Sequence, residues 1–298
     1  PAPTGPCRVL SVGILVADHL CSPIEQLPEA GQLVLADALP LQIGGCASNA
    51  AIDLARLKIP VGIIGCVGRD VFGRFVIDTL AEQGIDTNNI IQRESAATSG
   101  TLIVNVRGQD RRFIHTIGAN ATLTSNDVPL DLVRSAEVLY VGGYLLMPGL
   151  EQAGVLEVFR AARSAGVTTV LDVVLPGPGD HWPDLEQLLA ETDYFLPNND
   201  EASALTGQSN PRDQAQKFLD AGVGAAVITC GGEGTLLATS KDVLKAATYQ
   251  VPYVGGTGAG DAFDAGFIAG LLQQEDHAGC LRWGSALGAS CVQGVGAT

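Results

Sequence analysis

The chain alternates short apolar runs with segments of helical spacing, and this alternation constrains its fold more than any other feature. RVLSVGILV at 8–16 and VGIIGCVG at 61–68 are two of the apolar runs. Between such runs lie segments, such as 71–84 and 150–166, with apolar residues at helical spacing. Apolar strands that alternate with helices are typical of a parallel sheet covered on both faces. We therefore predict an α/β fold with a mostly parallel central sheet. The same reasoning predicts strands at 137–144, 168–174, 194–198 and 225–232, and helices at 48–57, 182–191, 200–207 and 213–222.

Two stretches depart from this alternation and predict a second, smaller sheet. Residues 31–45 and 98–118 combine strand-forming residues with polar alternation, and the second has a turn at Gly108–Asp110. Hairpin-like strands of this kind do not belong in a parallel sheet that is buried on both faces. The chain has no internal repeat, low-complexity tract or long linker. We therefore expect one α/β domain over 1–298, with a small β lid formed by 31–45 and 98–118.

The composition excludes several classes of partner. Seventeen Lys and Arg residues stand against 32 Asp and Glu, for a net charge of −15. This balance argues against a nucleic acid or an anionic membrane as partner, because both require clustered basic side chains. No segment reaches the length needed to span a membrane. An anionic substrate would need to be neutralised by a few basic residues or by a bound metal ion.

The seven cysteines and four histidines show no spacing typical of a disulfide framework or a zinc site. The cysteines include no CxxC pair, and their number is odd. Scattered cysteines of this kind are typical of reduced, mostly buried thiols in a cytoplasmic protein.

The glycine-rich stretch GGTGAGDAF at 255–263 is the first candidate site. Glycines before a helix let backbone amides converge on one point, where the helix dipole favours negative charge. The amides of Gly258, Ala259 and Gly260 could form an anion hole there, with Asp261 as a general base. The alternative is that Asp261 only caps the helix. The spacing matches neither GxGxxG nor GxxxxGK[ST].

Two motifs near the N-terminus carry groups that suit a hydroxyl-rich ligand. In IGGCASNAA, Gly44 and Gly45 permit close backbone approach and Asn49 begins a helix. Asp18 follows the first strand at its carboxyl end, where open α/β sheets bind ligands. The alternatives are an ordinary strand-to-helix turn for the glycines and a cap for Asp18.

Two further motifs lie in the second half of the chain. PNNDEASALTG places Asn198 and Glu201 three residues apart at a helix start, and on spacing alone a capping arrangement is favoured. In ITCGGEGTLLA, Thr229, Gly231 and Gly234 follow a buried strand. This turn is either a plain hairpin or a surface for a nucleotide.

Taken together and in this order, the motifs resemble those of the PfkB carbohydrate kinase family. GGCASNAA and GTGAGDAFDAGF match the two signatures of the family, and the resemblance extends from Val9 to near the end of the chain. It implies a ribokinase-like fold with a small inserted β-sheet lid. It also implies ATP-dependent transfer of the γ-phosphate to a hydroxyl of a sugar or sugar-like acceptor.

The resemblance assigns roles to the candidate residues. It implies that Asp261 is the catalytic base and that Gly258, Ala259 and Gly260 form the anion hole. Sugar hydroxyls would be bound by Asp18, Gly44, Gly45 and Asn49. The nucleotide would be contacted by Thr229, Gly231, Gly234 and Asn198, and Mg²⁺ would be organised by Glu201, through water. In this family the lid closes over the substrate and often forms a dimer contact, which implies a homodimer.

The sequence departs from the family pattern at several positions. Gly255 and Gly256 replace Asp-Thr, and the missing aspartate helps to bind K⁺ in many members, which argues against activation by K⁺. Arg69–Asp70 replaces an acidic pair. Tyr144 occupies the position of an acid that contacts ribose, so ribose is not the first substrate we expect.

The lid run RGQDRRF carries Arg111 and Arg112, which cannot both face the site because side chains alternate along a strand. If Arg112 faces inward, it could bind a carboxylate or phosphate on the acceptor. The alternative is a solvated turn.

Three other functions are compared with this one. A nucleoside kinase of adenosine type would use the same groups, with Phe113 or Tyr144 as a stacking ring. A catalytically silent sugar-binding relative has no need for Asp261 beside an anion hole. A nicotinamide oxidoreductase is excluded, because the first strand-to-helix turn has only Gly13.

Overall fold

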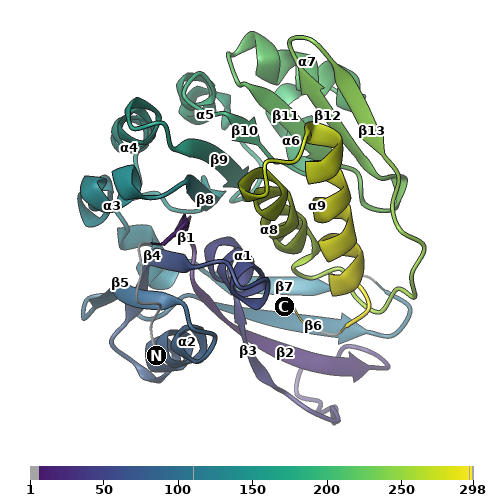
Figure 1. Ribbon diagram of the computed structural model, residues 1–298. Coiled ribbons are helices and arrows are strands. Elements are labelled where there is room, and N and C mark those ends of the chain that lie inside the picture. Colours follow the sequence, from purple (N-terminus) through teal and green to yellow (C-terminus); the bar gives the residue numbers. More distant parts are fainter. Residues whose placement is uncertain (1–6, 110, 295, 297–298) are drawn as a thin grey trace.

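The central sheet runs through the molecule with helices on both faces (Figure 1). The computed structural model describes residues 7–109, 111–294 and 296. Within them nine strands pair in the order β13-β12-β11-β10-β9-β8-β1-β4-β5. Neighbours from β11 to β5 are parallel, whereas β12 and β13 are antiparallel. The strands are β1 Val9–Gly13, β4 Val61–Gly68, β5 Asp86–Arg93, β8 Val138–Tyr144, β9 Thr168–Val173, β10 Tyr194–Phe195, β11 Ala225–Thr229, β12 Thr235–Thr239 and β13 Val243–Ala246.

The helices divide between the two faces of this sheet. One face packs against α1 Cys46–Arg56, α2 Val71–Glu82, α8 Ala259–Leu272 and α9 His277–Cys291. The other face packs against α3 Leu130–Ser135, α4 Gln152–Ser164, α5 Trp182–Leu189, α6 Asn199–Thr206 and α7 Pro211–Asp220. Single 3-10 turns lie at Gly118–Thr122, Ser125–Asp127 and Gly231–Glu233.

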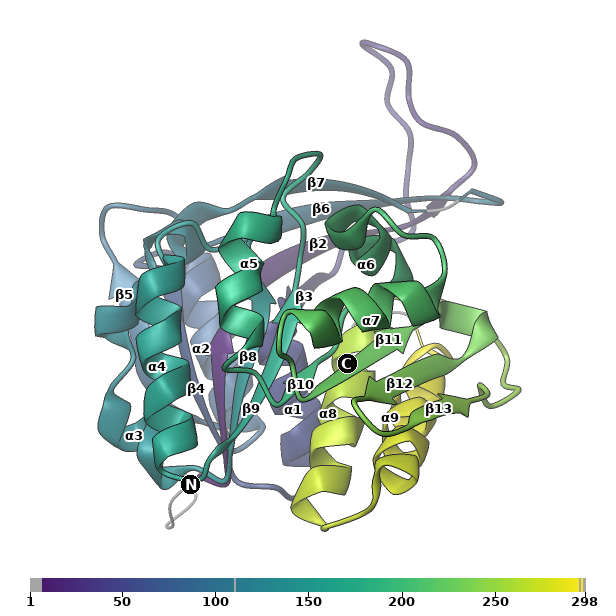
Figure 2. The same cartoon turned by 90° about the horizontal axis from the view of Figure 1, so that it is seen from above.

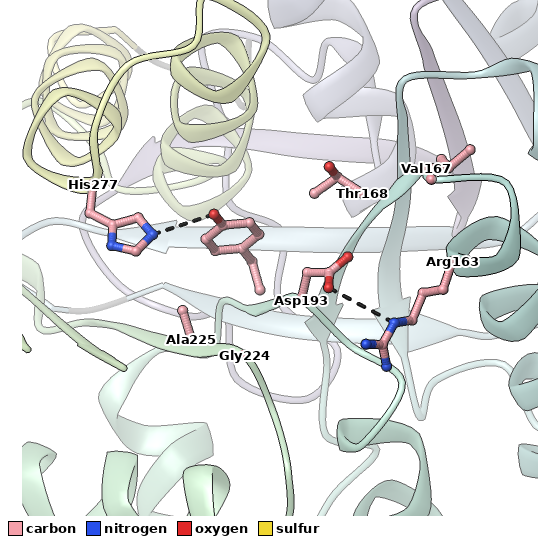
Figure 3. A pocket seen from close by; sticks show the side chains of 9 residues that line it. Arg163, Val167, Thr168, Asp193, Gly224, Ala225 and His277 are labelled. Carbon is pink, nitrogen blue, oxygen red and sulfur yellow. Dashed lines mark hydrogen bonds and ion pairs between the residues drawn. The ribbon is translucent and has the colours of Figure 1, made fainter. Parts of the chain in front are cut away.

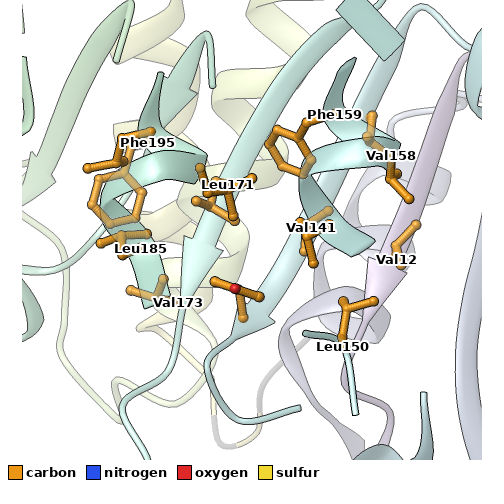
Figure 4. Packing of buried hydrophobic residues seen from close by; sticks show 14 of the residues in the cluster. Val12, Val141, Leu150, Val158, Phe159, Leu171, Val173, Leu185 and Phe195 are labelled. Atoms are coloured by element: carbon orange, nitrogen blue, oxygen red, sulfur yellow. The ribbon is translucent and has the colours of Figure 1, made fainter. Parts of the chain in front are cut away.

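Apolar side chains fill the space between strands and helices. On the α4 face, Val12, Val141 and Leu171 from adjacent strands pack against Phe159, and each is 1% exposed or less (Figure 4). Because these strands are buried on both faces, their sequences are almost continuously apolar, as the sequence predicted. The prediction of a mostly parallel sheet covered by helices on both faces is confirmed.

A second sheet of four strands has the order β3-β2-β6-β7 among the described residues. Its strands are β2 Val16–Ile24, β3 Leu41–Gly44, β6 Gly100–Val106 and β7 Arg112–Thr116. The stretch 98–118 contains a hairpin, as expected, since β6 and β7 pair antiparallel. The boundary 31–45 was wrong, because only Leu41–Gly44 of it is a strand. The expected strand at 8–16 is confirmed as β1, but its end was wrong, because β1 ends at Gly13 and β2, which we did not predict, begins at Val16.

The chain requires glycine at the break between β1 and β2. Gly13 has a φ of +153°, and a Cβ at that position would overlap the carbonyl oxygen of Gly142 on β8. Only glycine therefore fits where the chain leaves the central sheet and enters the small one. No described helix is long and apolar enough to cross a membrane.

Candidate active site

The loop before α8 brings backbone amides and a carboxylate to one helix start. Gly258 caps α8 in the left-handed region, with a φ of +76° that favours glycine. Its carbonyl accepts the first helical bond, from Ala262 N at 2.8 Å. Asp261 lies in the first turn, and its side chain does not cap the helix. The capping alternative for Asp261 therefore does not hold.

Two pockets meet at this loop. A pocket of 460 Å³, here called the sheet-side pocket, is lined by Thr257, Gly258 and Asp261 together with residues of the small sheet and α1. A pocket of 640 Å³, here called the hairpin-side pocket, lies beside the β11–β12 hairpin. The loop residues that line the hairpin-side pocket are Gly256, Ala259 and Gly260. One short loop therefore separates two spaces, each large enough for a ligand.

The sheet-side pocket is lined by three of the four hydroxyl-binding candidates, and Gly44 does not line it. Asp18, Gly45 and Asn49 line it, although they lie on β2, before α1 and within α1. Asn49 Nδ2 donates to Asp261 Oδ2 at 2.7 Å, so α1 and α8 are joined at the candidate base. Asp18 Oδ1 and Asn49 Oδ1 are buried acceptors with no hydrogen-bond partner among the described residues. Such acceptors suit hydroxyl donors of a ligand.

Gly44 and Gly45 are required by close contacts. A Cβ at Gly44 would overlap the Asp18 carboxylate, so only glycine leaves room for that side chain. Gly45 has a φ of +94°, and a Cβ there would overlap the carbonyl oxygen of Ile14.

A cluster of buried acidic groups surrounds Asp261. The Sγ atom of Cys46 and carboxylate oxygens of Asp172 and Asp261 lie within 4.8 Å of one another. Burial raises the pKa of Asp261, and hydrogen bonds from Asn49 and Cys46 oppose that shift. Burial and the charges of Glu201 and Asp261 hold the pKa of Asp172 well above its usual range. The sequence analysis missed Cys46 and Asp172, although Asp172 lies next to the carboxyl end of β9, where open α/β sheets bind ligands.

The Asn-x-x-Glu element forms the capping box that its spacing favoured. Asn198 Oδ1 accepts from the amides of Asp200 and Glu201 at 2.9 Å, and Glu201 Oε2 accepts from Asn198 N at 2.9 Å. Burial, with the nearby charge of Asp261, raises the pKa of Glu201 to about 7. Asn198 lines the hairpin-side pocket, whereas Glu201 does not.

The turn after β11 is a hairpin that also lines a pocket. Thr229, Gly231 and Gly234 all line the hairpin-side pocket. Gly234 has a φ of +97°, and Cys230 N donates to its carbonyl at 2.8 Å, which closes the turn into β12. The turn is therefore a hairpin whose residues also line a pocket, so the hairpin alternative and the nucleotide alternative do not exclude each other.

The small sheet presents Arg111, and not Arg112, to the glycine loop. Arg112 is exposed and its Nη2 donates to Gln109 Oε1, so the alternative in which it faces the site and binds the acceptor was wrong, and the solvated alternative holds. Arg111 donates through Nη1 to the Thr257 hydroxyl. Phe113 lines the sheet-side pocket. Tyr144 does not line it, because it is buried and its hydroxyl donates to the Asp184 carbonyl at 3.2 Å.

A third pocket lies at the amino ends of the central strands, away from the glycine loop (Figure 3). Its 520 Å³ volume is lined by residues at the starts of β9, β10 and β11 and by His277 of α9. Asp193 and Arg163 lie 4.0 Å apart there, and the Tyr194 hydroxyl lies 3.4 Å from His277 Nε2. None of the candidate residues lines this pocket.

Comparison with known proteins decides the family. The family described as pfkB family carbohydrate kinase matches residues 8–298. The chain belongs to this family of carbohydrate kinases.

Individual relatives agree with this assignment. The kinase is 31% identical to a ribokinase of Staphylococcus aureus, over 97% of this chain and 95% of the relative. It is 30% identical to an aminoimidazole riboside kinase of Salmonella typhimurium, over 85% of this chain and 79% of the relative. Among solved structures, Arabidopsis thaliana ribokinase complexed with ribose and ATP superposes with a TM-score of 0.84 at 25% identity, over 99% and 95% of the two chains. The ribokinase-like fold implied by the sequence is confirmed.

Proposed function

We propose that this kinase transfers the γ-phosphate of ATP to a hydroxyl of a sugar or sugar-like acceptor, with Asp261 as the general base. The observation that carries this proposal is the position of the glycine loop between two pockets. Asp261 lines the pocket that holds the hydroxyl-binding candidates, and Ala259 and Gly260 line the other. A transferred group at the loop would thus lie between donor and acceptor.

Each residue around the loop then has a defined task. Asp261 accepts the proton of the acceptor hydroxyl as its oxygen bonds to the γ-phosphorus. The Asn49 amide, 2.7 Å from Asp261 Oδ2, holds the carboxylate in position. The amides of Gly258, Ala259 and Gly260 donate to the oxygens on which negative charge develops. Asp18 and Asn49 orient the acceptor by accepting from its other hydroxyls, and closure of the small sheet over the pocket would exclude water.

The acidic cluster fits a requirement for Mg²⁺. The pKa values of Asp172 and Glu201 are both raised, first by burial and then by neighbouring carboxylates, and a divalent cation with oxygen ligands would relieve that repulsion. We assign Glu201 to Mg²⁺, through water, and Asn198, Thr229, Gly231 and Gly234 to the nucleotide. When bound, Mg²⁺ would neutralise charge on the phosphates. Gly255 leaves no carboxylate at its position, so we propose that K⁺ is not required.

The acceptor that fits the sheet-side pocket is uncharged. Asp18 and Asp261 both face this pocket, and no described Lys or Arg lines it. A carboxylate or phosphate on the acceptor would therefore be repelled at close range. Burial, with the charge of Asp261, raises the pKa of Asp18 to about 6, which shows how strongly the pocket disfavours negative charge.

A nucleoside kinase is the second candidate, and the apolar part of the same pocket favours it. Phe113 lies beside a wall made of Ile14, Val16, Ile103, Ile117, Leu146, Val174, Leu175 and Pro176. A free pentose has little apolar surface to place there, whereas the base of a nucleoside could pack on this wall and stack on Phe113.

A coupled assay of ADP release with Mg²⁺ and ATP tests the proposed function. The panel contains pentoses, hexoses, sugar acids, sugar phosphates and nucleosides, each with and without K⁺. We expect turnover with a neutral sugar or a nucleoside, little with the anionic compounds, and no requirement for K⁺. No turnover across the panel, combined with a raised melting temperature in the presence of a sugar, would favour a catalytically silent binding protein instead.

We also propose that the kinase forms a homodimer through the small sheet. Leu102 and Ile114 are paired across β6 and β7 and are exposed, and Leu33 and Leu35 are 81% and 86% exposed. Figure 2 shows the segment between β2 and β3, which carries these two leucines, projecting from the rest of the molecule. Exposed apolar residues on the small sheet and on its connecting segment favour a protein partner. Light scattering should give twice the chain mass, and Ile114→Glu should give a monomer; a monomeric wild-type protein would refute the proposal.

A further inference from the structure

Phosphoryl transfer in this kinase poses a charge problem. The net charge of the chain is −15, and Asp18, Asp172 and Asp261 gather around the glycine loop. No Lys or Arg in the described part of the chain lines the sheet-side or the hairpin-side pocket. Catalysis of phosphoryl transfer rests largely on positive charge placed beside the transferred group. A cation that contacts the loop is therefore important.

Arg111 is that cation. It directly precedes β7, and its Nη1 donates to the hydroxyl of Thr257 in the glycine loop. A Cβ at Gly256 would lie 3.5 Å from Arg111 Nη2, so the guanidinium lies beside both Gly256 and Thr257. Gly256 lines the hairpin-side pocket and Thr257 the sheet-side pocket. The charge of Arg111 thus lies where the two pockets meet.

The alternation along β7 explains this orientation. Phe113 and His115 line the sheet-side pocket, and Arg111 precedes them at the same two-residue period. The guanidinium carbon of Arg111 lies 5.7 Å from the centre of the Phe113 ring, a distance at which the ring attracts and supports the cation. Arg112 belongs to the opposite face and bonds to Gln109.

We propose that Arg111 binds the phosphoryl group in transit, and that the small sheet thereby supplies a catalytic residue to the glycine loop. This inference rests on the proposed function. The acceptor oxygen bonds to the γ-phosphorus while the bond from that phosphorus to the bridging oxygen breaks. The electron pair of the broken bond stays with ADP, and the hydroxyl proton goes to Asp261. Arg111 stays charged throughout and donates to the non-bridging oxygens of the transferred group.

The contact with Thr257 has a role in this scheme. The Thr257 hydroxyl accepts from the guanidinium and holds it beside the loop, ready to donate to phosphate oxygens. A planar guanidinium is suited to this exchange because it presents several N–H donors in a fixed geometry. Since Arg111 directly precedes β7 of the small sheet, its charge reaches the loop only when the sheet lies against the loop. Closure over the acceptor and assembly of the catalytic groups would then be one event.

The test compares Arg111→Gln with Arg112→Gln, a matched control with the adjacent arginine on the other face. With an acceptor from the ADP-release screen, Arg111→Gln should lower kcat by about 10²-fold or more, with the KM values for ATP and acceptor within about threefold of wild type. Arg111→Lys should restore part of kcat, and Arg112→Gln should match the wild-type protein. Circular dichroism should show the same melting temperature for all variants.

A binding measurement provides a readout that is independent of turnover. Calorimetry with Mg²⁺ and ADP, in the presence and absence of aluminium fluoride, compares the nucleotide alone with a mimic of the transferred group. Aluminium fluoride should tighten binding to the wild-type protein and to Arg112→Gln, and this gain should be lost in Arg111→Gln. A kcat within threefold of wild type for Arg111→Gln, or an unchanged gain from aluminium fluoride, overturns the role of Arg111. A wild-type protein with no turnover and no nucleotide binding overturns the proposed function itself.

Discussion

Asp18→Asn should make the protein more stable at pH 8 and have little effect on stability at pH 4. Asp18 is 9% exposed, and its pKa rises from 3.8 to about 6 in the folded state, mainly through burial. The folded state therefore holds the proton more tightly than the unfolded chain does. As pH rises from about 4 to about 6, the unfolded chain releases its proton first, so stability falls over this window. The asparagine variant does not ionise and avoids this loss.

The size of the effect follows from the two pKa values. Their difference corresponds to about 3 kcal/mol at pH 8, where both states of the wild-type protein are ionised, and to about 0.6 kcal/mol at pH 4. Because Asp18 is almost fully buried, solvent screening reduces this figure little. The same substitution should weaken acceptor binding, because one of the two carboxylate oxygens becomes an amide nitrogen, which cannot accept from a hydroxyl. The buried carboxylate thus costs stability and serves binding.

Urea unfolding at pH 4 and pH 8 measures this difference directly. The control is Asp37→Asn, which removes a carboxylate from an exposed position on the segment between β2 and β3. Asp18→Asn should raise the free energy of unfolding at pH 8 by an amount that shrinks toward pH 4, and the control should change it little at either pH. A variant that is no more stable than wild type at pH 8, or a gain that is independent of pH, would show that the Asp18 carboxylate does not destabilise the folded state.

Three further predictions concern activity. The specificity constant kcat/KM should fall as pH drops below about 7, because Glu201, with a pKa of about 7, and then Asp18, with a pKa of about 6, become protonated. A profile of kcat/KM that is flat down to pH 5 would contradict this. Gly44→Ala should raise the acceptor KM at least tenfold because its Cβ displaces the Asp18 carboxylate, whereas Gly100→Ala, in the same sheet with only ordinary contacts, should not. Phe113→Ala should raise the KM for a nucleoside by about three- to tenfold and leave that for a free sugar unchanged; equal effects on both would exclude stacking.

The central sheet could be predicted because its strands are buried on both faces, and such strands carry a strong apolar signal. Edge strands carry a weaker one. β5 has the sequence DTNNIIQR, pairs only with β4 among the described strands and was not predicted. β2 contains Asp18, His19 and Pro23, and it becomes a strand through pairing with β3 and β6, which are distant in sequence. Tertiary pairing of this kind overrides local propensity.

Prediction of the candidate site from the sequence was limited in the same way, residue by residue. Motifs located Asp261, Asn49 and Gly44, because each combines a special residue type with a strand-to-helix turn. The choice between Arg111 and Arg112 could not be made, because every residue of β7 is exposed and no buried face fixes which side chains point inward.

The most direct test of the central claim compares Asp261→Asn with the wild-type protein in transfer of labelled phosphate from ATP to the acceptor. The variant keeps the size of the side chain, and asparagine can still bond to Asn49, so folding and binding of both ligands should be preserved. We expect a fall in kcat of about 10² to 10⁴-fold, the usual range for loss of a general base, with unchanged dissociation constants for nucleotide and acceptor. Wild-type turnover in Asp261→Asn would contradict the claim that this carboxylate takes the proton of the attacking hydroxyl.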